Sequence, residues 1–101
     1  MAQFDVYTNT NNKTKKYIPF LLDIQNDILS DLNTRVVVPL ILDMSAAKIL
    51  NPKFNINNLQ VTMSTAELAG ISTDKLGTRV CSLQENKYEI IEAIDFMITG
   101  F

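Results

Sequence analysis

The side chains that could carry chemistry are few, and they form no catalytic constellation. The chain has no histidine, which removes the commonest general base and the commonest metal ligand. Its only cysteine, Cys81, therefore has no imidazole to activate it, and we interpret it as a small core residue. The three glycines, Gly70, Gly77 and Gly100, form no phosphate-binding loop. The residues alone give no reason to expect a catalytic residue, a metal site or a cofactor.

The charged side chains that could act together fall in two short groups. Asp23, Asp27 and Asp31 recur every four residues, which we interpret as a solvated surface, with an acid–base pair as the alternative. The second group consists of three lysines of one polar segment, Lys13, Lys15 and Lys16. We interpret these lysines as a soluble loop tip, with a contact to an acidic partner as the alternative.

Length and composition indicate an ordinary globular protein. At 101 residues the chain is expected to form one domain, 1–101, with one modest core. A net charge of −2 argues against a nonspecific hold on DNA or RNA. The longest apolar runs, Ile18–Leu22 and Val36–Leu42, are far shorter than the roughly 18 residues that a membrane span needs. Because there is no signal peptide and only one cysteine, we expect a cytoplasmic protein that does not bind membranes.

The sequence predicts five or more strands, mostly antiparallel, and these strands position the side chains described above. Apolar and polar residues alternate at 3–8, which predicts a first strand. A polar hairpin loop, Asn9–Lys16, then leads to a second strand at 17–25. Three consecutive valines make 35–42 the strongest strand signal, and Pro39 within it suggests an edge or a bend.

The middle of the chain gives weaker signals. We interpret Asn26–Thr34 as a loop and Asp43–Leu50 as a helical turn or two. Asn57 and Asn58 tolerate positive φ and lie between two alternating segments, which predicts a tight hairpin. The segment 64–77 is ambiguous between strand and loop.

One long helix is predicted at the C-terminal end. Ser82–Glu85 has the pattern of a capping box, and Gly100 suits the left-handed position just past a helix end. Seven apolar residues follow at helical spacing: Ile90, Ile91, Ala93, Ile94, Met97, Ile98 and Phe101. Strands first and a helix last predict an α+β fold with a small antiparallel sheet or open barrel.

Some apolar residues lie where a small core would not need them. They are Ile28 and Leu29 in a polar loop, Phe96 on the acidic side of the helix, and Met97, Ile98 and Phe101 at its end. Exposed apolar clusters often mark interfaces, so we expect a homodimer contact, a foreign protein partner, or both. The alternative for Phe101 is a last plug of the core.

Four blocks of this sequence, in this order, resemble the CcdB family of bacterial toxins. They are QFDVYTN at 3–9, LLDIQNDIL at 21–29, TRVVVPL at 34–40 and EIIEAIDFMITGF at 89–101. The resemblance spans essentially the whole chain. It implies a small antiparallel sheet of SH3-like barrel type with one C-terminal helix, assembled as a homodimer.

The resemblance also implies a function. Members are plasmid- or chromosome-borne toxins of type II toxin–antitoxin pairs, and the resemblance implies a role in plasmid maintenance. They are not enzymes and need no cofactor. They bind the A subunit of DNA gyrase and trap the complex of gyrase with cleaved DNA, so they act as topoisomerase poisons. A cognate antitoxin neutralises the toxin in the bacterial cytoplasm, and the two proteins together bind operator DNA and repress their own transcription.

The residues that match the family's gyrase-binding segments lie at the C-terminal end and in one loop. They are Asn26, Ile28, Leu29, Asp95, Ile98, Thr99, Gly100 and Phe101. Met97 matches the dimer interface. Thr99 stands where the family's pattern has a tryptophan, which takes an aromatic anchor away from that surface.

Two alternatives stay open. Related toxins on this fold are endoribonucleases, which need an acid–base pair and a cation to hold phosphate. Arg35, Arg79 and nearby acidic residues are candidates for those roles. The other alternative is a non-toxic dimeric relative that only binds antitoxin, which Thr99 would explain.

Overall fold

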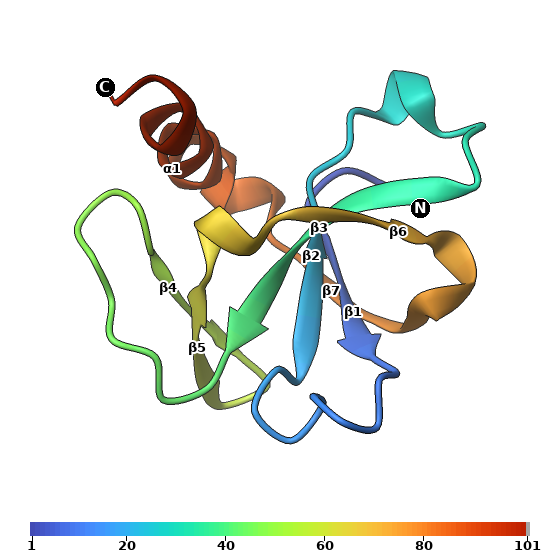
Figure 1. Cartoon of the computed structure of the whole chain (residues 1–101), viewed down its shortest axis with the longest axis horizontal. Helices are drawn as coiled ribbons and strands as arrows, with labels where there is room; N and C mark the ends of the chain where they lie inside the picture. Colours follow the sequence, from blue (N-terminus) through green and yellow to red (C-terminus); the bar gives the residue numbers. More distant parts are fainter. Residues whose placement is uncertain (101) are drawn as a thin grey trace.

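A curled antiparallel sheet with one α-helix beside it makes up the fold in the computed structural model, which describes residues 1–100 (Figure 1). The strands are β1 Asp5–Asn9, β2 Phe20–Asp23, β3 Thr34–Ile41, β4 Lys53–Ile56, β5 Leu59–Met63, β6 Ala69–Ser72 and β7 Leu76–Ser82. The helix is α1 Lys87–Thr99, and four 3-10 turns are η1 Asp27–Leu29, η2 Thr65–Glu67, η3 Thr73–Lys75 and η4 Gln84–Asn86. The α+β class with a C-terminal helix is confirmed. The expectations for Phe101 lie outside the described residues.

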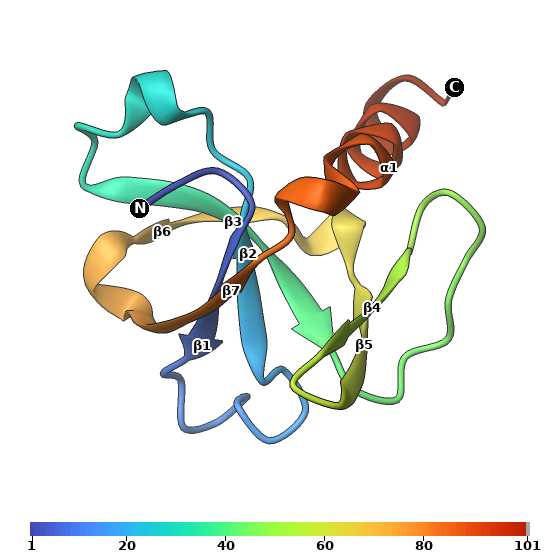
Figure 2. The ribbon, with the colours of Figure 1, turned by 180° about the vertical axis from the view of Figure 1, so that it is seen from behind.

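Strand β3 joins two parts of the sheet. The strand order is β4-β5-β3-β2-β1-β7, and β6 also pairs with β3. Along one edge of β3, Thr34–Val37 pairs with β6 and Leu40–Ile41 pairs with β5, while β2 pairs along the other edge. The sheet therefore curls into a half-barrel, and the β4–β5 hairpin branches from it on the side of α1 (Figures 1 and 2).

Pro39 was predicted to lie on an edge or at a bend, but β3 is the central strand. The proline lies where the partner of β3 changes from β6 to β5, so its missing amide hydrogen interrupts neither ladder. Its carbonyl oxygen still accepts a hydrogen bond from the Ser64 backbone nitrogen at 3.0 Å. A change of partner within one strand is a tertiary feature that local sequence does not encode.

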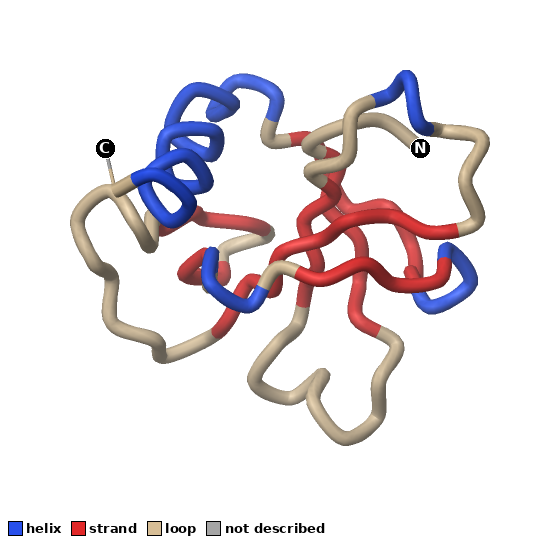
Figure 3. Tube along the Cα trace, turned by 45° about the horizontal axis from the view of Figure 1, so that its top comes forward, coloured by secondary structure: helices blue, strands red, loops and turns tan. Residues whose placement is uncertain are grey.

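The main apolar core lies on one face of the sheet, under α1. Alternate residues of β1, β2 and β3 point into it, with Val6, Leu22 and Val38 fully buried. From α1, Ile90 and Ala93 complete this core. Figure 3 shows the helix lying beside the curled strands. Among residues 1–100, no helix is long and apolar enough to cross a membrane.

The hairpin prediction is confirmed, whereas the helical turn predicted after β3 is wrong. Asn57 and Asn58, with φ of 51° and 66°, connect β4 to β5. The segment Asp43–Leu50 forms an irregular loop instead, with Ile49 at φ 70°. A short helix needs packing to persist, and here the side chain of Asn51 ties the loop to the Met63 carbonyl oxygen at 2.9 Å.

The C-terminal helix begins later than its predicted capping box. Ser82 is the last residue of β7, and its hydroxyl oxygen accepts from the Gln84 backbone nitrogen at 3.1 Å. The turn η4 follows, and α1 begins only at Lys87. The helix end is as predicted, because Gly100 has φ 79° and its nitrogen donates to the Phe96 carbonyl oxygen.

Candidate functional site

A cluster of charged and hydroxyl side chains lies on the second face of the sheet, opposite the main core. Because side chains alternate along a strand, Asp5 and Tyr7 of β1 point away from Val6. Asp23 of β2 and Arg35 of β3 are on this same second face. All four are buried, so each must find a partner within the protein.

Arg35 and Asp23 form a buried ion pair. The Nε and Nη2 atoms of Arg35 lie 2.8 Å and 2.7 Å from Asp23 Oδ2. Arg35 is only 1% exposed, so it cannot hold a phosphate from solvent. Burial raises the pKa of Asp23, while the bonds from Arg35 act to lower it. The interpretation of Asp23 as part of a solvated surface is wrong, because the pairing of β2 with β3 buries it against Arg35. Asp27 and Asp31 are exposed, as that interpretation expects.

Arg79 is the cation of the cluster that solvent reaches. Its Nε lies 3.2 Å from Oδ2 of the buried Asp5, yet its side chain is 55% exposed. The pairing of β1 with β7 shifts register between Val6 and Tyr7, which brings Arg79 opposite Tyr7. Such irregularities re-aim a side chain. The hydrogen bond that Arg79 donates to the Asp5 carboxylate raises the pKa of Arg79, which stays charged.

Tyr7 lies between Arg79 and Leu21 on the neighbouring strands β7 and β2. Its hydroxyl donates to Asp5 Oδ2 at 3.4 Å, and burial followed by the charge of Asp5 raises the Tyr7 pKa. Asp5 Oδ2 also accepts from the Ala2 backbone nitrogen at 3.1 Å. Two donors therefore hold the carboxylate that in turn fixes Arg79. A solvent-facing guanidinium held by a buried carboxylate is suited to bind an anion such as a phosphodiester.

Asp5 and Tyr7 were not singled out from the sequence. The one local signal is their alternation with Val6, which places two polar side chains on one face of a short strand. Their partners come from β7, more than seventy positions along the chain, so the cluster depends on the pairing of β1 with β7. Cys81 lies opposite Val6 and packs against the main core, and burial raises its pKa, as the core interpretation predicts.

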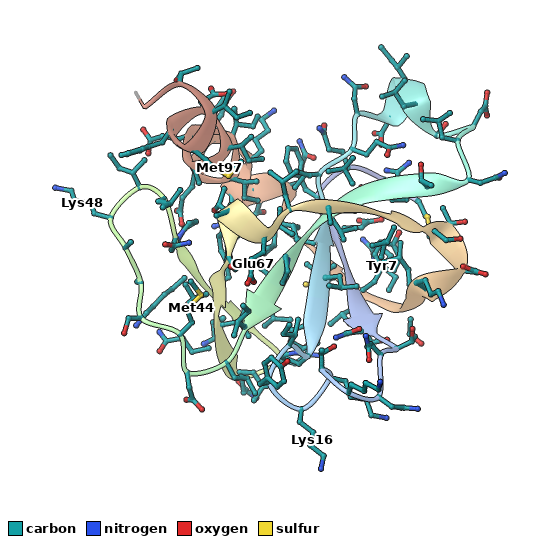
Figure 4. The ribbon with its side chains drawn as sticks, viewed as in Figure 1. Tyr7, Lys16, Met44, Lys48, Glu67 and Met97 are labelled. Carbon is teal, nitrogen blue, oxygen red and sulfur yellow. The ribbon has the colours of Figure 1, made fainter. Side chains whose placement is uncertain are left out.

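A cavity of about 630 Å³ opens beside this cluster, between the β1–β2 loop and η3. Its lining residues are Asn9, Thr10, Asn11, Asn12, Lys13, Thr14, Ile18, Leu21, Ile71 and Lys75. Of the three lysines interpreted as a loop tip, only Lys13 lines the cavity. Figure 4 shows Lys16 directed away from the body of the protein.

The predicted gyrase-binding residues of the loop lie on and around η1. Asn26 caps this turn, since its Oδ1 accepts from the Ile28 backbone nitrogen at 2.9 Å. Ile28 is 86% exposed, and Leu29 is also exposed. Local capping therefore fixes a small apolar tip that faces solvent.

The other predicted gyrase-binding residues lie at the end of α1. Ile98 is 70% exposed, and the Thr99 hydroxyl donates to the Asp95 carbonyl oxygen at 2.7 Å. Met97, the predicted dimer residue, is half-buried. Within one chain the helix end and the η1 tip stand at opposite ends of the same side of the molecule, so they form two patches (Figures 1 and 2).

Comparison with known families decides where this chain belongs. The family model described as CcdB protein matches residues 3–100, nearly the whole chain. The protein belongs to the CcdB family. The family resemblance drawn from the four sequence blocks is thereby confirmed.

Solved structures with the same fold include two mycobacterial endoribonucleases. One is an endoribonuclease in complex with its cognate antitoxin, with a TM-score of 0.78, 14% identity, and coverage of 97% of this chain and 94% of that chain. The second is an endoribonuclease with a TM-score of 0.76, 13% identity, and coverage of 97% and 90%. At identities this low, the TM-scores show that the fold is shared and show nothing further.

These neighbours overturn the expectation that a CcdB-like protein is not an enzyme, because the same fold carries endoribonucleases. In the sequence, the absence of histidine and the negative net charge also argue against an endoribonuclease. Neither is decisive: an arginine fixed by a buried carboxylate can stabilise charge at a phosphate without an imidazole. Net charge also averages over the surface and conceals a local cationic site.

Proposed function

We propose that this CcdB-family protein is the toxin of a toxin–antitoxin pair and that it cuts single-stranded RNA at a phosphodiester held by Arg79. The observation that carries the proposal is the half-exposed guanidinium of Arg79, fixed at 3.2 Å by the buried carboxylate of Asp5. The two endoribonucleases of the same fold support it, one of them solved with its cognate antitoxin. A cognate antitoxin is accordingly the partner that we propose.

The chemistry uses a nucleophile that RNA itself provides. The 2′-hydroxyl oxygen attacks the adjacent phosphorus and its proton passes to water. The bond from phosphorus to the 5′-oxygen breaks, and the departing oxygen takes a proton from water, so a 2′,3′-cyclic phosphate and a 5′-hydroxyl remain. Negative charge grows on the phosphate oxygens in the transition state, so a fixed cation stabilises that state more than the ground state. The planar fork of Arg79 suits two phosphate oxygens at once.

Asp5 and Tyr7 act in this proposal as positioning residues. The bond to Asp5 uses Nε of Arg79, and the other N–H donors of the guanidinium lie on its two terminal nitrogens. Tyr7 in turn donates to the same Asp5 oxygen and limits its movement. A cation held in place before the substrate arrives loses less entropy on binding than a mobile lysine.

The decisive experiment compares Arg79→Ala with the wild-type protein on a labelled single-stranded RNA. We expect roughly a 100-fold or greater loss of cyclic-phosphate product, because the charge at the transition state loses its partner. Lys48→Ala is the matched control, since Lys48 is an exposed cation on the side of the molecule opposite Tyr7 (Figure 4). DNA of the same sequence lacks the 2′-hydroxyl and should stay intact. Undiminished cutting by Arg79→Ala would refute the assignment.

Binding to the A subunit of DNA gyrase, with trapping of the gyrase–cleaved DNA complex, is the second candidate that we propose. The strongly exposed side chains of Ile28 and Ile98 favour it, since bare apolar side chains at two projecting tips suit a protein partner. A homodimer would present two copies of each tip to a twofold-symmetric target. Met97, the predicted dimer residue, is half-buried within one chain, so only part of its side chain is left to contact a second copy.

Ile98→Asp tests this second candidate in a supercoiling and DNA-cleavage assay with purified gyrase. A charge at an apolar contact should abolish the linear, protein-linked DNA that the wild type produces. Ile91→Asp is the control, because Ile91 is an exposed isoleucine of the same helix that lies outside the predicted patch. Equal accumulation of cleaved DNA with wild type and Ile98→Asp would contradict the assignment.

A further inference from the structure

The cavity between the β1–β2 loop and η3 has two kinds of lining. Its apolar side chains are Ile18, Leu21 and Ile71, and the others are asparagines, threonines and two lysines, Lys13 and Lys75. No carboxylate belongs to the described lining residues, although acidic residues outnumber basic ones in the whole chain. Its volume of about 630 Å³ is that of a small-ligand pocket. This combination suits a ligand with a flat apolar part and a negative charge.

The loop that forms one wall is held in a single shape by its own side chains. Asn9 Nδ2 donates to the Thr14 hydroxyl and to the Ile18 carbonyl oxygen, each at 2.9 Å. Asn9 Oδ1 accepts from the Asn11 nitrogen at 3.0 Å, and Asn11 Oδ1 accepts from the Lys13 nitrogen at 2.9 Å. A wall that is already ordered binds a ligand at a lower entropic cost.

The same loop is fastened to the opposite wall. The Thr10 hydroxyl donates to the Lys75 carbonyl oxygen at 2.7 Å, and the Thr78 nitrogen donates to the Thr8 hydroxyl at 2.9 Å. Gly77 allows this approach, because a Cβ there would lie 2.0 Å from the Thr8 hydroxyl oxygen and 2.9 Å from the Thr8 carbonyl oxygen. The two lysines are therefore carried by walls whose separation is fixed.

The apolar floor of the cavity continues toward Arg79. Leu21 and Ile71 pack against the small core cluster that contains Tyr7. Leu21, Tyr7 and Arg79 lie side by side on β2, β1 and β7, so Leu21 and Arg79 are about two strand spacings, roughly 10 Å, apart. A chain of phosphodiesters could thus follow one face from the cavity to the guanidinium.

We propose that this cavity binds one nucleotide of a single-stranded RNA, with its base on Ile18, Leu21 and Ile71 and its phosphate at Lys13 and Lys75. The inference deepens the proposed function and rests on it, because the neighbouring phosphate of the same strand then reaches Arg79. Asn11 uses its side-chain oxygen within the loop, and its amide N–H groups can donate to the edge of the base.

The test measures binding separately from cutting. A short fluorescent RNA with 2′-fluoro groups lacks the attacking hydroxyl, so its Kd can be measured by anisotropy without cleavage. We expect the double variant Lys13→Ala/Lys75→Ala to raise the Kd about tenfold or more at low salt and to weaken its salt dependence. Lys15→Ala/Lys16→Ala is the control, because it removes the same charge from the same loop outside the cavity. We expect the control to bind almost as the wild type does.

The outcomes separate the two proposals. Equal Kd values for the two double variants would overturn the cavity assignment, even if the wild type cuts RNA. Selective loss of binding in Lys13→Ala/Lys75→Ala would establish the cavity as a nucleotide site. If that loss were found while the wild type left ordinary RNA intact, the proposed cutting at Arg79 would be refuted and the binding site would stand.

Discussion

The two faces of strands β1, β2 and β3 are built on opposite principles. On the face under α1, Val6, Leu22 and Val38 are fully buried and need only fill volume. On the other face, the same strands bury Asp23 and Arg35 as an ion pair. Burying two charges gains little stability over a well-packed apolar pair, so the polar face is not explained by stability alone. The second buried carboxylate of this face, Asp5, holds the exposed Arg79.

The polar face also makes stronger demands on geometry. An apolar side chain can shift slightly and still exclude water, whereas a hydrogen bond weakens steeply once its angle or distance changes. Arg35 does not fully meet this requirement, because its Nη1 atom is buried and has no hydrogen-bond partner within residues 1–100. The two faces should therefore respond differently to substitution.

The largest expected effect is on the ion pair. Asp23→Ala removes the buried carboxylate that pairs with Arg35 and leaves only the exposed Asp27, 3.9 Å from Nη2, as a counter-charge. We expect a loss of about 3–5 kcal/mol in the free energy of unfolding. Chemical denaturation measures it. The double variant Asp23→Leu/Arg35→Met removes both charges, and we expect it to be close to the wild type in stability. If the double variant were as unstable as Asp23→Ala, the charges themselves would be required for folding.

A smaller effect is expected where β1 meets β7. Gly77→Ala forces the new Cβ against the Thr8 backbone oxygen, which cannot move as a side chain can, and should cost about 1–3 kcal/mol. Gly70→Ala is the matched control, since a Cβ at Gly70 meets nothing within 4 Å. Thermal melting of both variants checks the prediction, and equal melting temperatures would show that the β1 backbone at Thr8 yields to the added methyl group.

The smallest effect is expected at Tyr7. Tyr7→Phe keeps the ring and removes the hydroxyl that donates to Asp5, so it should cost about 0.5–1.5 kcal/mol at pH 7. Because the folded pKa of Tyr7 is raised, its contribution is complete below about pH 10 and is lost as the pH rises through the folded value. Urea midpoints from pH 7 upward should show this alkaline decline in the wild type and a weaker decline in the variant. Tyr17→Phe, at an exposed tyrosine, should leave the decline unchanged.

Features governed by neighbouring residues could be predicted from the sequence. The alternation of β1, the Asn57-Asn58 hairpin and the glycine that ends α1 each depend on the backbone preferences of a few residues. Two other features could not be predicted, because a tertiary contact competes with a local helical signal. The loop at Asp43–Leu50 is tied to β5, and α1 starts late because Ser82 belongs to the end of β7. The exposed Ile28 and Ile98 were anticipated as misplaced apolar residues and face solvent as expected.

The features of the candidate site also divide into those that the sequence indicates and those that depend on contacts between distant residues. From the sequence alone it followed that the fold is α+β, that the chain resembles the CcdB family, and that any chemistry has to do without histidine. Only the tertiary structure decided that Arg35 is buried against Asp23 while Arg79 faces solvent on Asp5. The physical reason is that both arginines have the same immediate neighbours in the sequence, Thr-Arg-Val at 34–36 and at 78–80. Their exposure is set by which strand pairs beside them and by the register shift between β1 and β7, and these depend on residues far apart in the chain.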